Sequence, residues 1–309
     1  MNIIKPVDRA LIHEELIKDK FIRTTNNGNN EIYVIDYRNA PNTIREIGRL
    51  REISFRDAGG GTGKELDLDK FDTGNYPYQQ LIVWNPEDNE IVGGYRYIHC
   101  KDAGFNEEGK PDLATTELFN FSETFIKDYL PYTIELGRSF VQPAYQPTVD
   151  IRKGMYSLDN LWDGLGALFV DNPYSKYYFG KITMYPRFNI VARDLILYFL
   201  RKYFIDKDEL VTPKIAVELK TDMIKLKNTL YGKNYNEDYK ILVQEVRRHN
   251  ENLPPLVNAY MNLSSTMKYF GTAVNHGFGA VEESAIIIAL EDIYDIKKAR
   301  HLSTYKKGV

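Results

Sequence analysis

The sequence predicts a protein of the α/β (α+β) class, in which helices are inserted between the strands of a mixed sheet. Stretches in which apolar and polar residues alternate, as in strands, are followed by stretches with the apolar spacing of helices. Clusters of Gly, Pro, Asn and Asp separate many of these stretches. With 309 residues, of which 43% are hydrophobic and 27% charged, the chain can bury one large core.

The first strand is predicted over residues 31–36, after the turn-rich residues 24–30. A helix follows, and Thr43 with Glu46 has the spacing of a capping box at its start. Residues 57–76 are then predicted to form a loop, with glycines at its start and acidic residues at its end. The apolar residues of the helix fall on one face: Ile44, Ile47, Leu50 and Phe55.

Further strands are predicted along the rest of the chain. Residues 79–84 and 90–98 flank a turn-forming connection, which predicts a hairpin. Residues 133–141, 177–184 and 284–290 also have the pattern of strands, the last of them buried. Helices are predicted at 155–170 and 189–203.

We expect one main domain with a C-terminal extension. The composition changes near Pro213, and residues 215–250 are rich in charges of both signs. The predicted division is an N-terminal segment (1–30), a core (31–205) and an extension that packs on the core (206–309).

The composition argues against several kinds of function. The formal net charge is −3, whereas a domain that neutralises phosphates is clearly basic, so no nucleic-acid partner is predicted. The single cysteine, Cys100, and five scattered histidines predict neither a disulfide nor a metal site. The chain has no stretch of signal-peptide type and none that approaches the ~18 apolar residues of a membrane span, so we expect a cytoplasmic protein.

The best functional lead is the run Glu135-Leu136-Gly137-Arg138 in a predicted strand. A carboxylate and a guanidinium three positions apart on a strand point to opposite faces, unless a bulge brings both toward one site. The structural alternative is an ion pair at a strand end.

A second charged set lies upstream. Arg51 is on the first predicted helix, three aspartates follow in the loop, and Arg96 ends another strand. Carboxylates and arginines in such numbers around apolar strands favour a functional site, although the aspartates alone could belong to a solvated loop. The aspartates are Asp67, Asp69 and Asp72.

These motifs together resemble a known family. Arg51 with Phe55, the acidic stretch 67–72, Gly-Gly-Tyr-Arg at 93–96 and Glu-Leu-Gly-Arg-Ser at 135–139 are similar in order and spacing to the hemolysin-named N-acyltransferases of ornithine-lipid and glycine-lipid synthesis. Those enzymes and the related acyl-homoserine-lactone synthases are members of the GNAT superfamily. The resemblance covers about residues 43–205 and 253–293; residues 57–64 and 272–275 depart from the family pattern.

The resemblance implies a GNAT-like mixed, mostly antiparallel central sheet flanked by helices, with a C-terminal extension. It also implies a cytoplasmic acyltransferase that moves a long, 3-hydroxylated acyl chain from acyl carrier protein to the amine of a small amino acid, glycine or ornithine. No bound cofactor is expected, because the donor carries its own phosphopantetheine arm, on carrier protein or as acyl-CoA.

The same resemblance suggests roles for individual residues. An amine must lose a proton before it attacks a thioester, and a nearby carboxylate can accept that proton. Glu135 is the first choice for this base and Asp69 the second, with Arg138 beside them. Arginines can bind the acceptor carboxylate and hold the acidic loop, and backbone N–H groups near 140–142 can hold the oxyanion. The expected substrate-binding residues are Arg51, Phe55, Asp72, Arg96, Phe140 and Val141.

The donor side is predicted from residues 142–154. An acetyl-CoA site has a glycine-rich loop that wraps the pyrophosphate, but this segment has one late glycine and two cations. That pattern favours carrier protein over coenzyme A, although the cations could simply be solvated. The expected donor-binding residues are Gln142, Arg152, Lys153 and Gly154.

Three alternative functions are also compatible with the sequence. They are an acetyl-CoA-dependent N-acetyltransferase, signal-molecule synthesis from S-adenosylmethionine, and a non-catalytic, hemolysin-like protein associated with a membrane. A peripheral contact with the inner membrane is also compatible with an enzyme, because the product would be a lipid and residues 215–248 carry several lysines and arginines.

Overall fold

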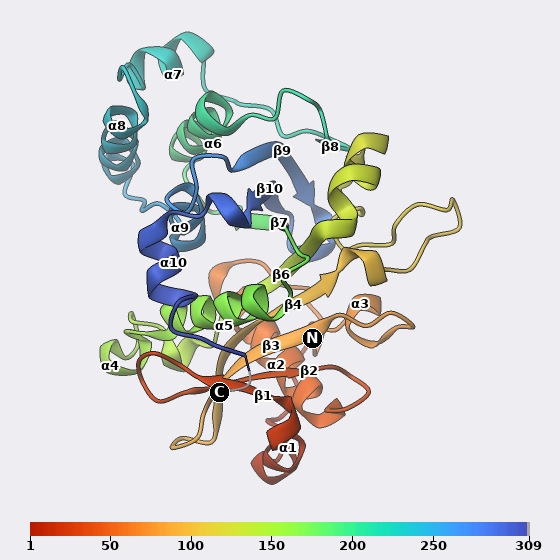
Figure 1. Cartoon of the computed structure of the whole chain (residues 1–309). Helices are drawn as coiled ribbons and strands as arrows, with labels where there is room; N and C mark the ends of the chain where they lie inside the picture. The colour runs from red at the N-terminus through yellow and green to blue at the C-terminus, as the bar shows by residue number, and fades with distance from the viewer. Residues whose placement is uncertain (308–309) are drawn as a thin grey trace.

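The computed structural model describes residues 1–307 and is built around one large sheet (Figure 1). Eight strands follow the order β1-β2-β3-β4-β6-β7-β10-β9, and every neighbouring pair is antiparallel except β6–β7. This confirms the α/β class with a mixed, mostly antiparallel sheet. The strands are β1 (Phe21–Thr24), β2 (Glu31–Ile35), β3 (Gln79–Asn85), β4 (Glu90–His99), β6 (Thr133–Val141), β7 (Tyr177–Met184), β9 (Lys268–Asn275) and β10 (Val281–Ala289). A separate pair consists of β5 (Phe119–Phe121) and β8 (Val211–Pro213).

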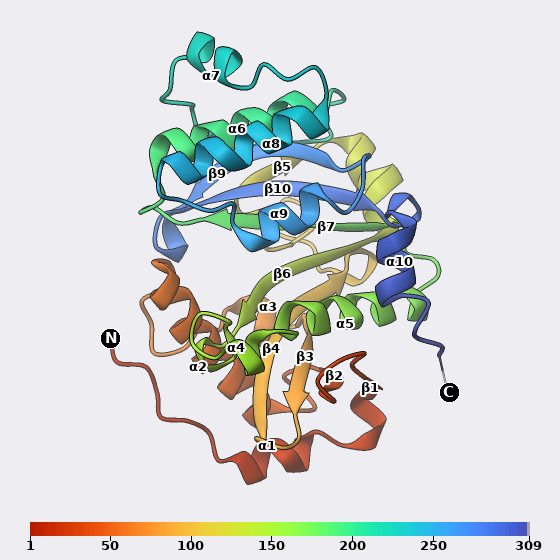
Figure 2. The same ribbon diagram turned by 90° about the vertical axis from the view of Figure 1, so that its left-hand side faces the viewer.

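Helices cover both faces of this sheet (Figure 2). On one face α5, α6 and α9 pack against β3, β4, β6, β7 and β10, and on the other face α2 packs against β3, β4 and β6. Among the described residues, no helix is both long and apolar enough to cross a membrane. The helices are α1 (Arg9–Glu15), α2 (Pro41–Ala58), α3 (Lys70–Thr73), α4 (Ile151–Gly154), α5 (Ser157–Asp171), α6 (Ile190–Phe204), α7 (Met223–Thr229), α8 (Tyr235–Arg248), α9 (Pro255–Met261) and α10 (Asp295–His301).

The capping box predicted at Thr43 and Glu46 is wrong. Helix α2 begins at Pro41, and its N-cap, Ala40, has no side chain to accept a hydrogen bond. The backbone N–H and the hydroxyl of Thr43 both donate to the Glu15 carboxylate, each at 2.7 Å, and Glu46 accepts from the N–H of Val7 instead. A carboxylate from α1 therefore satisfies the first turn of α2, which local sequence could not reveal.

The segment predicted as a loop over residues 57–76 contains one helical turn, α3. Asp69 caps it by accepting from the N–H of Phe71 at 2.9 Å, and the Asp72 carboxylate accepts from the N–H of Asp69 at 3.1 Å. This reciprocal capping box fixes the conformation of the acidic stretch.

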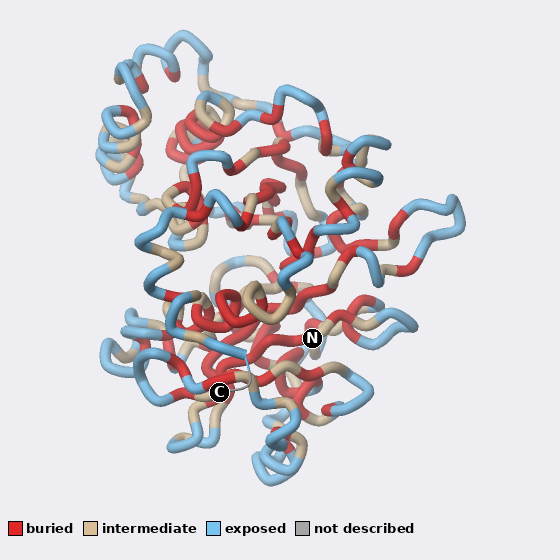
Figure 3. The backbone as a smooth tube through the Cα atoms, in the orientation of Figure 1, coloured by how far each residue is buried: buried red, intermediate tan, exposed pale blue. Residues whose placement is uncertain are grey.

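The C-terminal part of the chain contributes two strands to the central sheet. The strand predicted at 284–290 is confirmed as part of β10, which lies between β7 and β9. Figure 3 shows that buried backbone runs through the sheet and through α5 and α6, whereas α7 is mostly exposed.

Strands β6 and β7 diverge near the middle of the sheet. Their parallel pairing runs from Thr133–Tyr177 to Leu136–Gly180 and stops there. A Cβ atom at Gly180 would lie 2.6 Å from the Leu136 carbonyl oxygen, so the last point of contact requires glycine. Beyond it, β6 pairs with β4 alone, and a cleft opens between β6 and β7.

Candidate active site

Three arginines and three aspartates form one network above the sheet. Arg51 of α2 binds Asp67 through Nε at 2.9 Å and Asp72 through both terminal nitrogens at 2.9 and 3.0 Å. Arg96 of β4 binds Asp69 at 2.8 Å and Asp72 at 3.1 Å. The structure thus brings together residues that sequence analysis placed in three separate segments, and their formal charges cancel.

Burial raises the pKa values of these carboxyl groups, and ion pairing with the arginines lowers them. Arg51, Asp67 and Asp72 are fully buried, and burial alone would favour the neutral acids. The charges of Arg51 and Arg138 outweigh burial at Asp67, and those of Arg51 and Arg96 outweigh it at Asp72, so both pKa values lie below the ordinary value. Within the described residues, no group of three His, Cys, Asp or Glu side chains is arranged to hold a metal ion.

Arg138 joins this network through a β-bulge. Gly94 pairs with Phe140 and Arg96 with Gly137, so two residues of β6, Arg138 and Ser139, lie opposite Tyr95 alone. Arg138 has a φ of 48°, and its Nε lies 3.0 Å from Asp67. A bulge is the condition under which Arg138 and Glu135 were expected to lie on one side of the sheet.

Phe55 and Arg138 meet through Phe278, which follows β9. The rings of Phe55 and Phe278 are 5.0 Å apart in an edge-on arrangement, and the Arg138 guanidinium lies 4.0 Å from the centre of the Phe278 ring. A residue from the C-terminal part of the chain therefore supports the arginine at the charged end of the cleft.

Glu135 lies on the same side of the sheet but in a closed environment. Its carboxylate accepts from the Tyr78 hydroxyl, from the Thr115 hydroxyl and from the Thr115 N–H at 2.8 Å. Tyr78 in turn packs edge-on against Phe71 of α3, and the Arg96 guanidinium lies 5.4 Å from the Tyr78 ring. Burial raises the pKa of Glu135, and the hydrogen bonds from Thr115 and Tyr78 only partly oppose it.

A second ion pair lies next to Glu135, on β7 and β10. Lys181 Nζ is 2.7 Å from Glu283 and 3.2 Å from the carbonyl oxygen of Ala114, the residue before Thr115. Burial opposes ionisation of Glu283, but the Lys181 charge outweighs it and holds its pKa below the ordinary value. Lys181 also opposes the rise in the pKa of Glu135.

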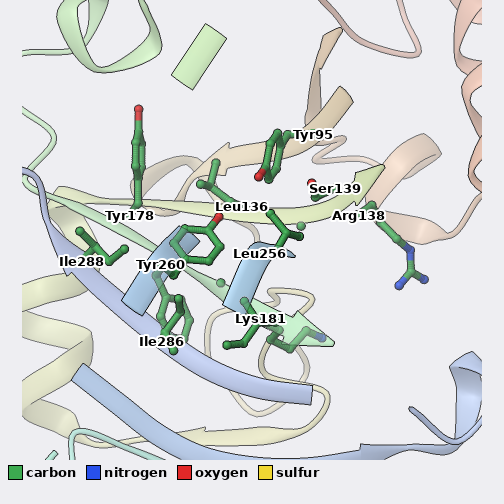
Figure 4. A pocket seen from close by; sticks show the side chains of 14 residues that line it. Tyr95, Leu136, Arg138, Ser139, Tyr178, Lys181, Leu256, Tyr260, Ile286 and Ile288 are labelled. Carbon is green, nitrogen blue, oxygen red and sulfur yellow. The ribbon is translucent and has the colours of Figure 1, made fainter. Parts of the chain in front are cut away.

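A cavity occupies the cleft between β6 and β7 (Figure 4). Arg138, Ser139 and Lys181 lie toward one end of it, and apolar side chains such as Ile286 and Ile288 lie toward the other. Helix α9 contributes further lining residues. Glu135 does not line this cavity, because Tyr78 and Thr115 enclose its carboxylate.

Other predicted residues surround this cleft without entering it. Phe140 is buried in the cluster beneath α2, and Val141 pairs with Gly93. The N–H of Gln142 donates to the Val92 carbonyl at 3.0 Å, so it is already occupied. The regular pairing of β6 with β4 is interrupted at Arg138–Ser139, and β7 has already diverged there, one step earlier than the expected position of the oxyanion donors.

Side-chain contacts fix the conformation of the predicted donor loop. Asp150 caps α4 by accepting from the N–H groups of Arg152 and Lys153, and Lys153 Nζ lies 2.6 Å from Asp88. Gly154 packs tightly on Pro147, while the Arg152 side chain is exposed. Lys153 is exposed as well but is paired with Asp88, whereas the Arg152 side chain forms no ion pair with any described residue.

Sequence reasoning missed several residues of the site. Lys181 and Glu283 are charged residues within otherwise apolar strands, a signal that could have identified them. Tyr78 and Thr115 lie in connecting segments that gave no such signal. Their roles follow only from the tertiary fold.

Comparison with known proteins agrees with this geometry. A family model described as an acetyltransferase (GNAT) domain matches residues 50–152, which extend from α2 to α4. A protein of Phocaeicola vulgatus named glycine N(alpha)-acyltransferase is 56% identical over 306 residues, covering 99% of this chain and 94% of that protein. A protein of the same name from Bacteroides thetaiotaomicron is 56% identical over 304 residues, covering 98% of this chain and 90% of that protein.

No solved structure is significantly similar to this chain. The relatives, however, match it almost from end to end, and the matched domain contains the arginine–aspartate network and the bulge. The protein therefore belongs to the family of these two relatives, a family of acyltransferases with the GNAT fold.

Proposed function

We propose that the protein transfers a long acyl chain from the phosphopantetheine thioester of an acyl carrier protein to the amine of glycine. The observation that carries the proposal is the cleft between β6 and β7, which is apolar along most of its lining and has Arg138 and Lys181 at one end. Two relatives named glycine N(alpha)-acyltransferase support glycine over ornithine as the acceptor.

In the proposed reaction, the ammonium of glycine first loses a proton. The neutral nitrogen attacks the thioester carbonyl carbon, the C–N bond forms and the C–S bond breaks. The nitrogen loses a second proton as the amide forms, and the carrier leaves as the free thiol. We assign the backbone N–H groups of Arg138–Ser139 to the oxyanion, because the regular pairing with β4 is interrupted at this bulge and β7 has already diverged from β6.

Glu135 is the proposed base. A raised pKa suits this role, because it brings the carboxylate closer to the working pH. The Tyr78 hydroxyl already donates to Glu135, so it can relay the proton by accepting one from the amine as it gives its own to the carboxylate. Asp69 is the weaker candidate, since Arg96 holds both of its oxygens.

Arg138 is the proposed ligand of the acceptor carboxylate. Arg51 is fully buried and Arg96 nearly so, and both are engaged by the aspartates. Arg138 is also paired with Asp67, but it is partly exposed and lines the cavity. Arg51 and Arg96 then hold the acidic stretch in place, while Arg138 binds the substrate.

The donor loop supports carrier protein over coenzyme A. A pyrophosphate needs free N–H groups at a helix start, but Asp150 already accepts from those of α4. Because Lys153 is paired with Asp88, Arg152 is the better candidate for contact with an acidic carrier protein. The relation to ornithine-lipid enzymes and acyl-homoserine-lactone synthases stays a prediction, as does the acetyl-CoA alternative.

The test is an assay of the full chain with each donor and acceptor class. Long-chain acyl carrier protein, the matching acyl-CoA and acetyl-CoA are each combined with glycine, ornithine or buffer. We expect thiol release and an N-acylglycine mass only with carrier protein and glycine. Activity only with acetyl-CoA would replace the proposal by an N-acetyltransferase, and no thiol release in any combination would refute it.

A further inference from the structure

Lys181 and Glu283 form an ion pair within the sheet, and the proposed reaction gives neither of them a step. Lys181 lies on β7 and Glu283 on β10, and Lys181 Nζ is 2.7 Å from the Glu283 carboxylate. The two side chains are only 14% and 4% exposed. Burying such a pair removes both ions from water, and apolar side chains of similar size often stabilise a fold as well. Stability alone therefore does not account for this pair.

Lys181 also holds the segment that closes over Glu135. Its Nζ donates to the Ala114 carbonyl oxygen at 3.2 Å. The N–H of Ala114 donates to the Tyr78 hydroxyl at 3.0 Å, and the N–H of Thr115 donates to the Glu135 carboxylate at 2.8 Å. Residues 114 and 115 thus bind Lys181 on one side and both Tyr78 and Glu135 on the other.

These contacts connect β6 and β7 across the cleft. Glu135 lies on β6 and is in register with Phe179 of β7, and the two strands stop pairing one residue later. Lys181 follows Phe179 by two residues, so its side chain lies on the same face of the sheet as Glu135. Where the backbone hydrogen bonds between the strands end, the segment 114–115 and Lys181 provide the connection.

Lys181 acts on Glu135 through its charge as well. The Lys181 cation opposes the rise in the pKa of Glu135 that burial causes. Glu283 compensates this cation, and Arg138 and Tyr185 face Glu283 in turn. The charge beside the proposed base is therefore that of a balanced pair, and removing either member should change the pKa of Glu135.

The other titratable groups around Glu135 do not change charge near neutral pH. Burial raises the pKa values of the Tyr78 hydroxyl and the Cys100 thiol, so both groups are neutral there. The Arg96 guanidinium lies 5.4 Å from the centre of the Tyr78 ring and stays charged. A change in the pH dependence of the rate after substitution of Lys181 can therefore be assigned to Glu135.

We propose that Lys181, held by Glu283, is a positioning residue that fixes the segment 114–115 on Glu135 and supplies the balanced charge beside it. This inference rests on the proposed function. In this role Lys181 acts through the Ala114 carbonyl and through its charge, without touching the acceptor. The competing role is direct binding of the acceptor carboxylate, because Lys181 lines the same end of the cavity as Arg138 (Figure 4).

The test measures kcat, KM for glycine and their pH dependence with long-chain acyl carrier protein. Lys181→Met should lower kcat about tenfold, the usual size of one hydrogen bond, with little change in KM. It should also move the acidic limb of kcat/KM up by about one pH unit, because the carboxylate loses a nearby cation. Lys181→Arg keeps the charge and should keep the limb at the wild-type pH. Lys176→Met, at an exposed lysine just before β7, is the control and should match the wild type.

A double variant keeps the test valid if Lys181→Met fails to fold with Glu283 left unpaired. Lys181→Met/Glu283→Leu removes both charges, so it should fold, keep the loss in kcat and shift the limb less than the single variant. A raised KM for glycine with unchanged kcat and limb would make Lys181 a ligand of the acceptor instead. Wild-type kcat and limb in both variants would leave the pair a structural role alone. Either result overturns the inference.

Infrared spectroscopy without substrates provides a readout that does not depend on turnover. The C=O band of protonated Glu135, identified by its absence in Glu135→Gln, is titrated in the wild type and in Lys181→Met. Its midpoint should move up by the same amount as the limb. A shifted midpoint without any turnover would support the coupling of Lys181 to Glu135 while the proposed function fails. Turnover by the wild type with an unshifted midpoint would overturn the inference and leave the proposed function intact.

Discussion

Arg138 occupies a backbone conformation that side chains other than glycine rarely adopt. Its φ of 48° lies in the left-handed region, which costs roughly 1–2 kcal/mol for an L-residue. The bonds to Asp67 and the stacking on Phe278 offset that cost. The bulge turns the guanidinium toward the acidic stretch while Glu135, three residues earlier, stays beside Tyr78. The strained backbone of Arg138 is therefore part of the bulge that shapes the cleft between β6 and β7.

Glu135→Gln is expected to lower kcat by about 10²–10⁴-fold while the protein remains folded. Glutamine has nearly the same shape and can still accept from Thr115, but it cannot take up a proton. Burial raises the pKa of Glu135 above its ordinary value of 4.5, and the carboxylate is the active form of a base. The wild-type kcat/KM should therefore fall as pH drops through this raised pKa, and that limb should disappear in Glu135→Gln. Rate–pH profiles with a melting curve for each variant provide the measurement.

The control for this prediction is Glu117→Gln, which removes an exposed carboxylate two residues from Thr115. It should keep the wild-type rate and pH profile. If Glu135→Gln retains wild-type turnover, the role of Glu135 is structural, and the base must be sought elsewhere in the cleft.

At the level of elements, the arginine–aspartate network fixes α3 against α2 and β4. Asp72 bonds to Arg51, Arg96 and the Gln80 amide, which lies 3.0 Å away, and also caps α3. A single aspartate therefore connects one short helix to a long helix and to two strands. The acidic stretch is ordered by buried charge rather than by apolar packing alone.

Asp72→Asn is expected to destabilise the fold by about 3–5 kcal/mol at neutral pH, because it leaves buried arginine charge uncompensated. The pKa values of Asp67 and Asp72 lie below the ordinary 3.8 in the folded protein, so the unfolded chain takes up protons first as the pH falls. Their contribution to stability is fully present above that ordinary value and is lost as pH falls through the folded values. Urea unfolding at several pH values should show a shallower acid loss in Asp72→Asn.

Asp112→Asn serves as the matched control for α3. Asp112 pairs with Lys70 of α3 at 2.7 Å, but both side chains are substantially exposed. Such a pair contributes ~0–1 kcal/mol, so the control should unfold almost like the wild type. Equal destabilisation by the two variants would show that burial of the network is not what holds α3.

Elements set by neighbouring residues in the sequence could be predicted, whereas contacts between residues far apart in the chain could not. The strands 133–141 and 177–184 were predicted with the bounds of β6 and β7, because their apolar patterns are strong. The start of α2 was wrong because its first turn is satisfied by Glu15, from another helix. Thr115, which donates to the buried Glu135 carboxylate, lies twenty positions earlier in the chain, so no local sequence pattern could predict this contact.

On the scale of the whole molecule, the two ends of the sheet belong to different parts of the chain. The N-terminal strands β1 and β2 form one edge and β9 the other, so the C-terminal residues help to build the sheet that holds the site. Helix α7 lies outside this layer, at the top of Figure 1. Three large apolar side chains are exposed on it or just after it: Met223 (41% exposed), Ile224 (68%) and Tyr231 (75%).

Exposed lysines accompany these apolar groups on α7 and just after it, at 225, 227 and 233. Apolar side chains flanked by cations are the pattern of a segment that inserts shallowly into an anionic membrane surface. Such a contact suits the proposed function, because an N-acylated amino acid with a long chain partitions into lipid. The peripheral membrane contact predicted from sequence is therefore assigned to α7 as a proposal.

Flotation with vesicles tests this proposal. The wild type is expected to float with vesicles that contain anionic lipid, less so at high salt because screening weakens the lysine contribution. Ile224→Asp should reduce the bound fraction about tenfold, since it removes one buried apolar side chain and adds repulsion. The control is Ile296→Asp, at an isoleucine that is 77% exposed on α10, away from α7. Because the substitution and the exposure are matched, equal loss in both variants would mean that α7 is not the contact, and no flotation of the wild type would remove the membrane from the proposal.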